Sequence, residues 1–381
     1  CIQENLTAIR VVKSYVRGDY EVEKFGVVNE NLKSESEKAF GTAVLNMPAM
    51  QFVMYGTILG ILLIGGRLIN EGQMMIGQLT SFLSYVLLIL NSLMMMSNVF
   101  LLMTRSLASA ERIMEVIDEK IDITDENAKD IAVAKGEIEF DHVWFKYKDT
   151  AKEYVLSDVS FHIKPGQTVG IIGQTGSSKT TLVQLIPRLY DVTKGEVKID
   201  GINVKEYPVR HLRDAVAMVL QKNTLFSGSL IDNLRWGNEN ATLDEIKEAC
   251  QIACVDEFVD RLADGYDTEM GQEGVNVSGG QKQRICIARA ILKKPKVLIL
   301  DDSTSAVDTA TEAKIRSGLA EKLPDMTKII IAQRISSVRH ADQIIIMDRG
   351  HVEAIGTHES LLRDNQIYQE IYASQKEGAD L

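Results

Sequence analysis

The chain has 381 residues, of which 45% are hydrophobic and 25% charged, and its formal net charge is -11. This length is typical of two or three domains, and such a chain can bury an ample core without disulfides. The acidic balance argues against a nucleic-acid partner bound by counterion release, which requires a basic face. We interpret the four scattered cysteines as reduced thiols packed in a cytosolic domain: Cys1, Cys250, Cys254 and Cys286.

The first residues follow a helical pattern from the outset. Residue 1 is a cysteine, and no charged segment followed by an apolar run opens the chain as in a signal peptide. We therefore expect a fragment that lacks its true N-terminus.

Two long uncharged runs, residues 39–66 and 72–104, dominate the first part of the chain. Between Ala39 and Thr104 only Arg67 and Glu71 carry charge, and nine of the 14 methionines lie there. Each run exceeds the roughly 20 residues that a helix needs to cross a bilayer. We predict a membrane hairpin with spans at about 44–66 and 77–103, rather than two buried helices of a soluble bundle.

The basic residues predict how this hairpin is oriented. Only Arg67 lies between the two spans, whereas six Lys and Arg residues precede the first: Arg10, Lys13, Arg17, Lys24, Lys33 and Lys38. Because Lys and Arg concentrate on the cytoplasmic side, both chain ends should be cytoplasmic. We expect a multi-pass protein of the cell membrane, in contact with lipid.

A polar linker at residues 119–136 separates the predicted membrane part, 1–118, from a domain at 137–381. Short apolar strands alternate with helical segments in this domain, at 167–172, 297–301, 329–332 and 344–348. Strands this apolar are buried on both faces, which favours a largely parallel α/β sheet. The predicted fold class is all-α transmembrane helices followed by an α/β domain.

The strand at 167–172 leads into the loop GQTGSSKTT and a helical pattern from Leu182 to Tyr190. Exposed amides and a helix start hold phosphate in this arrangement, while Lys179 reaches the β and γ oxygens and Thr180 ligates magnesium. The usual G-x-x-x-x-G-K-[ST] pattern has glycine where this chain has Ser178. We predict that the loop binds nucleotide through Gly173, Gln174, Thr175, Gly176, Ser177, Ser178, Lys179, Thr180 and Thr181. The domain at 137–381 is therefore predicted to be an α/β P-loop nucleotide-binding domain.

Two further motifs extend the site. The run VLILDD ends an apolar strand with Asp301, which we expect to hold Mg²⁺. The run VSGGQKQR opens a long helical stretch with a serine and two glycines, which form a second anion site. Since one nucleotide does not obviously use two phosphate-binding helix starts, the pair suggests a site shared between two subunits.

At these motifs the chain resembles the ATP-binding cassette (ABC) exporters along essentially its whole length. The resemblance implies that the first part holds the last two of six membrane helices, preceded by a coupling helix near Ala8 to Tyr15. It implies that Tyr147 stacks on adenine, that Gln221 touches Mg²⁺, and that Glu269 to Gly274 is the loop before the signature. It also implies a signature for the partner's ATP at Ser278, Gly279, Gly280 and Gln281, and a loop crossing to the partner at Asp308. ATP and Mg²⁺ are the expected cofactors, with Thr180, Gln221 and Asp301 at the metal.

Two positions depart from the exporter pattern at the chemical centre. Asp302 stands where the family has a catalytic glutamate, and Gln333 stands where it has a switch histidine. The shorter carboxylate is pulled back by about 1.5 Å, and a shift of about 1 Å can cost on the order of 10²-fold in rate. Gln333 can donate a hydrogen bond but cannot carry the charge of a protonated imidazole. We therefore predict a degenerate catalytic site at Asp302 and Gln333.

The near-intact signature predicts a heterodimer of two unlike half-transporters, in which the partner's intact site does most of the hydrolysis. One alternative is a homodimeric exporter with Asp302 as an adequate base. Others are a soluble cassette ATPase, against which the membrane hairpin argues, and a regulatory ATP sensor that transports nothing. The methionine-rich spans suit hydrophobic compounds but are also ordinary filler against lipid. Export of a small hydrophobic or amphipathic substrate, such as a drug or lipid, therefore follows from the resemblance, with peptide export as the runner-up.

Overall fold

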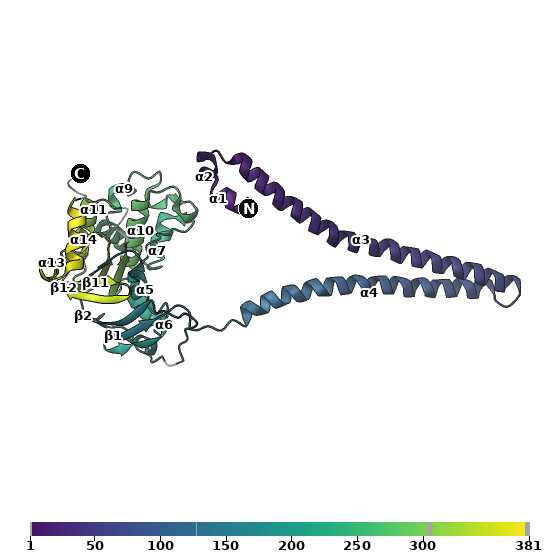
Figure 1. Ribbon diagram of the computed structural model, residues 1–381, viewed down its shortest axis with the longest axis horizontal. Helices are drawn as coiled ribbons and strands as arrows, with labels where there is room; N and C mark the ends of the chain where they lie inside the picture. The colour runs from purple at the N-terminus through teal and green to yellow at the C-terminus, as the bar shows by residue number, and fades with distance from the viewer. Residues whose placement is uncertain (1, 127, 303–306, 378–381) are drawn as a thin grey trace. The chain divides into compact units, whose positions relative to one another are not determined.

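The computed structural model describes residues 2–126, 128–302 and 307–377 (Figure 1). Contacts within the chain divide it into two compact units, residues 1–120 and 121–381. The first unit is helical, and the second is built on a sheet with helices around it. The structure therefore has a helical unit followed by an α/β unit, which is the predicted fold class.

The first unit consists of two short helices and two long ones. The short helices are α1 (Ile2–Thr7) and α2 (Ile9–Ser14), where the coupling helix was expected. The long helices α3 (Gly18–Asn70) and α4 (Ile76–Ile117) are joined by a short loop, lie close together near it and diverge away from it (Figure 1). At Gly65 of α3, an added Cβ would stand 2.3 Å from Leu79 Cδ1 of α4. The glycine therefore allows the two helices to approach closely near the loop.

Both long helices contain a stretch that is long and apolar enough to span a membrane. These stretches are Met47–Asn70, with a mean hydropathy of 1.9, and Ile76–Met96, with 1.8. Only 6% of the first and none of the second is buried within the structure, so they are not core helices of a soluble fold. At 1.5 Å per residue, α3 is about 80 Å long, far more than the roughly 30 Å of a bilayer core. The helices therefore continue well beyond the predicted spans.

A six-stranded sheet forms the centre of the second unit, in the order β12-β11-β3-β10-β9-β6. All neighbours are parallel except β11 and β12, which are antiparallel. The four predicted apolar runs form four of its buried strands, β3, β9, β10 and β11. The bounds of all six strands are β3 (Thr168–Gly173), β6 (Val216–Val219), β9 (Val297–Asp301), β10 (Thr327–Ile331), β11 (Gln343–Asp348) and β12 (His351–Gly356).

A second, antiparallel sheet was not foreseen from the sequence. Its order is β2-β1-β4-β5, and it comprises β1 (Ile138–Phe145), β2 (Leu156–Ile163), β4 (Lys194–Ile199) and β5 (Ile202–Asn203). Buried positions alternate with exposed ones in β2, because one face of this sheet meets the core and the other meets solvent. Phe140 and Phe161 stack across β1 and β2 with their ring centroids 4.5 Å apart. A core cluster joins these strands to the parallel sheet.

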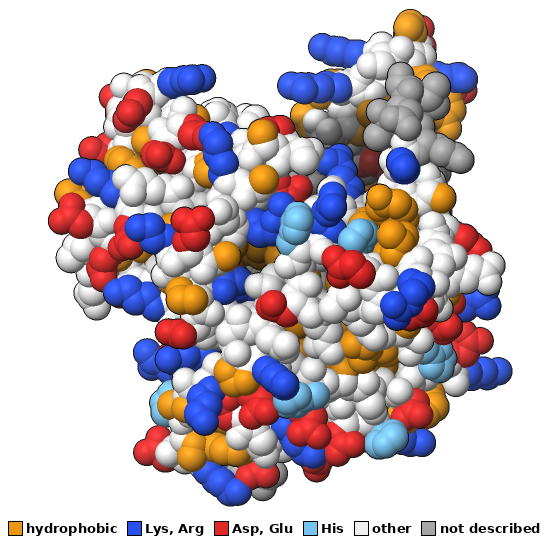
Figure 2. Space-filling model, turned by 90° about the vertical axis from the view of Figure 1, so that its left-hand side faces the viewer, with side chains coloured by type: hydrophobic (Ala, Val, Ile, Leu, Met, Phe, Trp, Pro, Cys, Tyr) orange, Lys and Arg blue, Asp and Glu red, His pale blue; other side chains and the backbone are white. Residues whose placement is uncertain are grey.

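Helices cover the parallel sheet and pack into the second core cluster. Two short strands, β7 (Gly228–Ser229) and β8 (Glu269–Met270), pair with each other in a separate antiparallel sheet. Figure 2 shows acidic and basic side chains interspersed over the face in view. The α-helices are α5 (Lys179–Gln184), α6 (Val209–Ala215), α7 (Leu230–Arg235), α8 (Leu243–Ile252), α9 (Asp256–Val259), α10 (Gly279–Leu292), α11 (Thr309–Lys322), α12 (Ile335–Val338), α13 (His358–Asp364) and α14 (Gln366–Glu377).

The segment expected to be a linker is fastened to the second unit over much of its length. Asp200 accepts hydrogen bonds from the backbone N–H groups of Ala134 at 2.7 Å and Lys135 at 2.9 Å. Earlier in the segment, Asp125 Oδ1 accepts one from Val209 N at 2.9 Å. The three cysteines that the structure describes, Cys250, Cys254 and Cys286, are buried and unbridged, as the sequence predicted.

Thr327 ties the start of β10 to two other segments. Its fully buried hydroxyl donates to Gly136 O at 2.8 Å and accepts from Gly166 N at 3.0 Å. We predict that Thr327→Val, which leaves both backbone groups unpaired, costs about 2 kcal/mol and lowers the unfolding midpoint by about 4–8 °C. Thr327→Ser keeps the hydroxyl and should lose much less. Thermal unfolding of the two variants checks this, and equal midpoints would contradict it.

Candidate nucleotide-binding site

The phosphate loop lies between the end of β3 and the start of α5. Lys179 Nζ donates to Gly173 O and Gln174 O, both at 2.8 Å, and to Ser177 Oγ at 3.2 Å. The loop therefore curls around its own lysine and holds the ammonium group at its centre. Burial is the main reason why the pKa of Lys179 lies below its ordinary value. A phosphate in this loop would meet a cation held in place by backbone carbonyls.

The backbone of this loop turns through two left-handed residues. Gly176 has a φ of 85° and Ser178, the helix N-cap, a φ of 71°. A residue with a Cβ is strained by about 1–2 kcal/mol in the left-handed conformation. This strain explains why the usual pattern has glycine at the position of Ser178. The chain thus keeps the turn of a phosphate loop although its residue is serine.

Gly173 marks a close approach of two neighbouring strands. A Cβ at this position would stand 2.1 Å from Met347 O of β11, which is too short for any contact. The predicted helix from Leu182 to Tyr190 is wrong in its extent, because α5 ends at Gln184. Pro187 accounts for this, since the residue before a proline is forced away from the helical conformation.

Asp301 ends β9 beside the first turn of α5. Its side chain is 1% exposed, and its Oδ1 accepts a hydrogen bond from Thr180 Oγ1 at 3.1 Å. Its Oδ2 is buried and has no hydrogen-bond partner among the residues that the structure describes. The pKa of Asp301 is raised, chiefly by burial. A buried carboxylate oxygen without a partner, next to a hydroxyl, fits an oxygen-seeking cation such as Mg²⁺.

The next residue, Asp302, pairs with the side chain at the switch position. Gln333 Nε2 donates to Asp302 Oδ2 at 2.8 Å. Burial raises the pKa of Asp302, and the bond from Gln333 opposes this rise. Asp302 has a φ of 46°, so it too lies in the left-handed region. The structure therefore brings together the two positions at which the chain departs from the exporter pattern.

These groups line one cleft of about 290 Å³. It lies at the carboxyl ends of β3, β9 and β10, the edge at which open α/β sheets bind their ligands. Ile331 also lines it, a position that the sequence analysis did not select. The other lining residues are Thr175, Gly176, Ser178, Lys179, Thr180, Thr181, Gln221, Asp301, Asp302 and Gln333.

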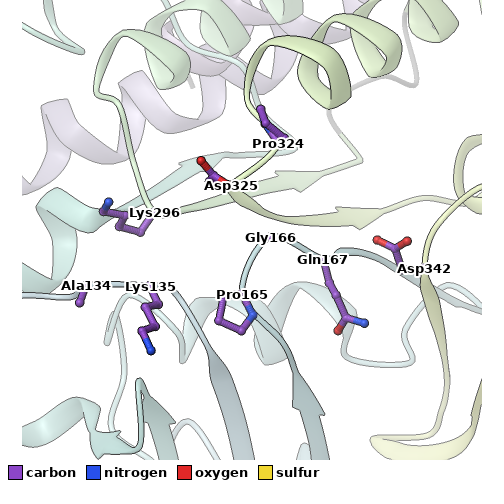
Figure 3. A pocket seen from close by; sticks show the side chains of 9 residues that line it. All are labelled: Ala134, Lys135, Pro165, Gly166, Gln167, Lys296, Pro324, Asp325 and Asp342. Carbon is purple, nitrogen blue, oxygen red and sulfur yellow. The ribbon is translucent and has the colours of Figure 1, made fainter.

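A larger hollow of about 560 Å³ lies at the opposite edge of the sheet (Figure 3). Gln167, Lys296, Asp325 and Asp342 border it, and each comes shortly before a parallel strand. The hollow therefore sits at the amino ends of the strands, away from the phosphate loop. Size alone would favour it for a nucleotide, but the phosphate-binding groups line the smaller cleft.

Tyr147 lies beyond the end of β1, near the phosphate loop. Its hydroxyl is 2.9 Å from Thr181 Oγ1, and the residue as a whole is 50% exposed. The edges of Phe145 and Tyr190 contact it at centroid distances of 4.9 and 5.1 Å. The sequence analysis missed Tyr190, whose only signal was an aromatic residue shortly after the phosphate loop. The three rings form an aromatic cluster with the exposed surface that a base needs for stacking.

The signature lies apart from this cleft. Ser278 caps α10: its Oγ accepts from Gln281 N at 3.3 Å, and Gln281 Oε1 accepts from Ser278 N at 2.8 Å. Gly279 and Gly280 form the first turn. Asp308 caps α11 in the same manner, with Thr311 N donating at 2.9 Å, and this bonding lowers the pKa of Asp308. None of these residues lines the cleft, and the SAV part of SAVD lies partly outside the described residues.

Two family models match the chain and together account for more than half of it. Residues 1–93 match the ABC transporter transmembrane region, and residues 156–305 match the ABC transporter domain. The chain belongs to the ABC transporters. It is a membrane protein whose ATPase unit lies on the cytoplasmic side, as in ABC exporters.

Individual relatives agree with this assignment. The uncharacterized ABC transporter ATP-binding protein YfiB of Bacillus subtilis is 42% identical over 381 residues, covering 100% of this chain and 66% of YfiB. YgaD of the same species, provisionally named a multidrug export ATP-binding/permease protein, is 36% identical over 380 residues, or 98% of this chain and 64% of YgaD. The chain thus spans just under two thirds of the length of these relatives.

A solved structure shares the fold. It is a bacterial Atm1-family ABC exporter with ATP bound, 29% identical in sequence, with a TM-score of 0.90. The match covers 98% of this chain and 66% of the exporter chain. The helical unit and the ATPase unit are therefore those of an ABC exporter half-transporter.

The left-handed Ser178 generates a stability prediction. We expect Ser178→Gly to stabilise the ATPase unit by about 1 kcal/mol, because glycine adopts this conformation without strain. Ser177→Gly is the matched control: its φ is not positive, and its hydroxyl accepts from Lys179. Thermal unfolding should show a higher midpoint for the first variant and a lower one for the second. A lower unfolding midpoint for both variants would contradict the strain argument.

Proposed function

We propose that the chain is the ATP-binding and permease subunit of an exporter, and that it forms the degenerate-site half of a heterodimer. The exporter couples ATP binding and hydrolysis to the outward movement of a hydrophobic or amphipathic substrate. The two exposed apolar helices and the ATPase unit in one chain support this assignment. The naming of YgaD for multidrug export supports the substrate class.

The hydrogen bond from Gln333 to Asp302 carries the proposal of a degenerate site. A general base must lie within hydrogen-bond reach of the attacking water, and the carboxylate of Asp302 is one methylene shorter than that of the family's glutamate. Its Oδ2 also accepts a hydrogen bond from the Gln333 amide, which has no proton-accepting nitrogen of its own. Such a pair holds a γ-phosphate by hydrogen bonds and aligns water poorly. We infer that this site retains ATP and hydrolyses it slowly.

The residues around Asp301 fit the magnesium ion that accompanies ATP. Thr180, Asp301 and Gln221 would hold it, and when bound it neutralises charge on the β and γ phosphates. Asp301 Oδ2 supplies the acceptor that lacks a partner in the protein. Lys179 contributes a second positive charge from within the loop, and Tyr147 offers its ring to the base.

The signature serves a different nucleotide. Since Ser278 to Gln281 do not line the chain's own cleft, their capped helix start is available to an ATP held by a partner. ATP held between two such units favours the closed state by its higher affinity for that state. Closure moves the membrane helices outward-facing, and hydrolysis at the partner's site reopens them.

Restoring the family residues tests the proposal. In the full-length protein assembled with its partner, Asp302→Glu combined with Gln333→His should raise hydrolysis at this chain's site by at least about 10-fold. Retention of labelled ATP after a chase with unlabelled ATP should shorten in parallel. Steady-state phosphate release and the chase measure the two effects.

Two single variants distinguish the sites. Ser278→Ala should lower the turnover of the assembled transporter, because it acts on the partner's ATP, whereas Asp302→Ala should change turnover less than about twofold. If the exporter is a homodimer with Asp302 as the base, Asp302→Ala should instead abolish most of the turnover. Brisk hydrolysis by the full-length chain alone, abolished by Asp302→Ala, would refute the heterodimer.

A further inference from the structure

The last helix, α14, contacts the backbone of the switch segment, residues 332–335, through one side chain. Gln375 Nε2 donates to Gln333 O at 2.7 Å. Its Oε1 accepts from Ile335 N at 2.8 Å. Both ends of one amide group are therefore bonded to the switch segment, which joins β10 to α12.

The switch segment needs these bonds from Gln375 because the helix that follows it, α12, is short and lacks a side-chain cap. The helix contains four residues, and its N-cap, Arg334, makes no side-chain capping bond. The first N–H groups of a helix lack partners within it. Gln375 satisfies the one on Ile335 from outside, and it fixes the carbonyl of the residue whose side chain reaches Asp302.

Gln375 is itself held in place by the packing of α14. At the other end of the helix, Tyr368 is fully buried and its hydroxyl lies 2.8 Å from His358 Nδ1 of α13. Gln369 Nε2 donates to Leu362 O at 2.9 Å and to Arg363 O at 3.1 Å. Tyr368, Tyr372 and Gln375 are spaced so that they share one face of α14. The helix is therefore anchored at α13 and reaches the switch segment with its last turn.

A hollow of about 290 Å³ lies beside Asp302, Gln333 and Gln375, which all line it. The other lining residues are Glu312, Ala332, Arg334 and Ser337. Without the two bonds from Gln375, the switch segment has space to shift into this hollow. Such a shift would move the Gln333 side chain relative to Asp302.

We propose that Gln375 is a positioning residue, which holds the switch segment so that the Gln333 amide reaches Asp302 and the γ-phosphate. The last turn of α14 thereby sets how long ATP stays at this chain's site. This inference rests on the proposed slow site, and nothing in the family comparisons assigns a role to α14.

The test uses the full-length transporter with its partner in lipid nanodiscs and labelled Mg-ATP as the probe. We expect Gln375→Ala to shorten the half-time of ATP retention at this site about fivefold, the effect of losing typical hydrogen bonds. Gln369→Ala is the control: it removes two similar bonds from the same helix but touches only α13. Its half-time should change less than twofold, with a comparable loss in thermal stability.

A double variant separates positioning from general loosening. If Gln375 acts through the Gln333 side chain, Gln375→Ala should have little further effect once Gln333→Ala is present. Full additivity, or equal effects of Gln375→Ala and Gln369→Ala, would overturn the inference. If the unmodified site instead releases ATP within one turnover, the slow-site proposal is wrong. In that case the hydrolysis rate of Gln375→Ala tests the positioning role. A fivefold fall in kcat at unchanged KM supports this role, and an unchanged kcat refutes it.

Discussion

The site depends on the in-register parallel pairing of β3, β10 and β9. Ile331 of β10 pairs with Ile171 on one side and with Asp301 on the other, so the three strands end at one edge. Because the carboxyl ends of parallel strands meet there, the phosphate loop, Asp301 and Gln333 converge at this edge. The larger hollow in Figure 3 shows the converse: the amino ends of the same strands carry no phosphate loop.

The three departures from the exporter pattern all act at this edge. Ser178 adopts left-handed backbone where the usual pattern has glycine, so its side chain costs conformational energy. Asp302 is also left-handed, a conformation that aspartate adopts more readily than most residues. The fold therefore keeps the turn of the phosphate loop although serine does not favour it. Gln333 and Asp302 form a hydrogen bond with each other. The degenerate site that we propose rests on this bond.

Support for the switch segment comes from the far end of the chain. Gln375 is 42 positions beyond Gln333 in sequence, yet its amide bonds the backbone of that residue. Under the slow site that we propose, this contact would let α14 influence the retention of ATP through the switch backbone.

The sequence by itself determined the features that depend on neighbouring residues. The uncharged runs, the buried strands, the phosphate loop and the helix start at Ser278 are local patterns. The structure has helices and strands at these places, although its second apolar stretch is Ile76–Met96 and the predicted span was about 77–103. The antiparallel sheet was missed because its alternation is interrupted by bulges, as between Phe140 and Val143. The predicted helix after the phosphate loop was too long, because the prediction followed the spacing of the apolar residues and did not take Pro187 into account. Tertiary structure alone decided the Asp302–Gln333 bond, the aromatic contact of Tyr190 and the clasp of Gln375, since each joins residues that only the folded sheet and its covering helices bring together.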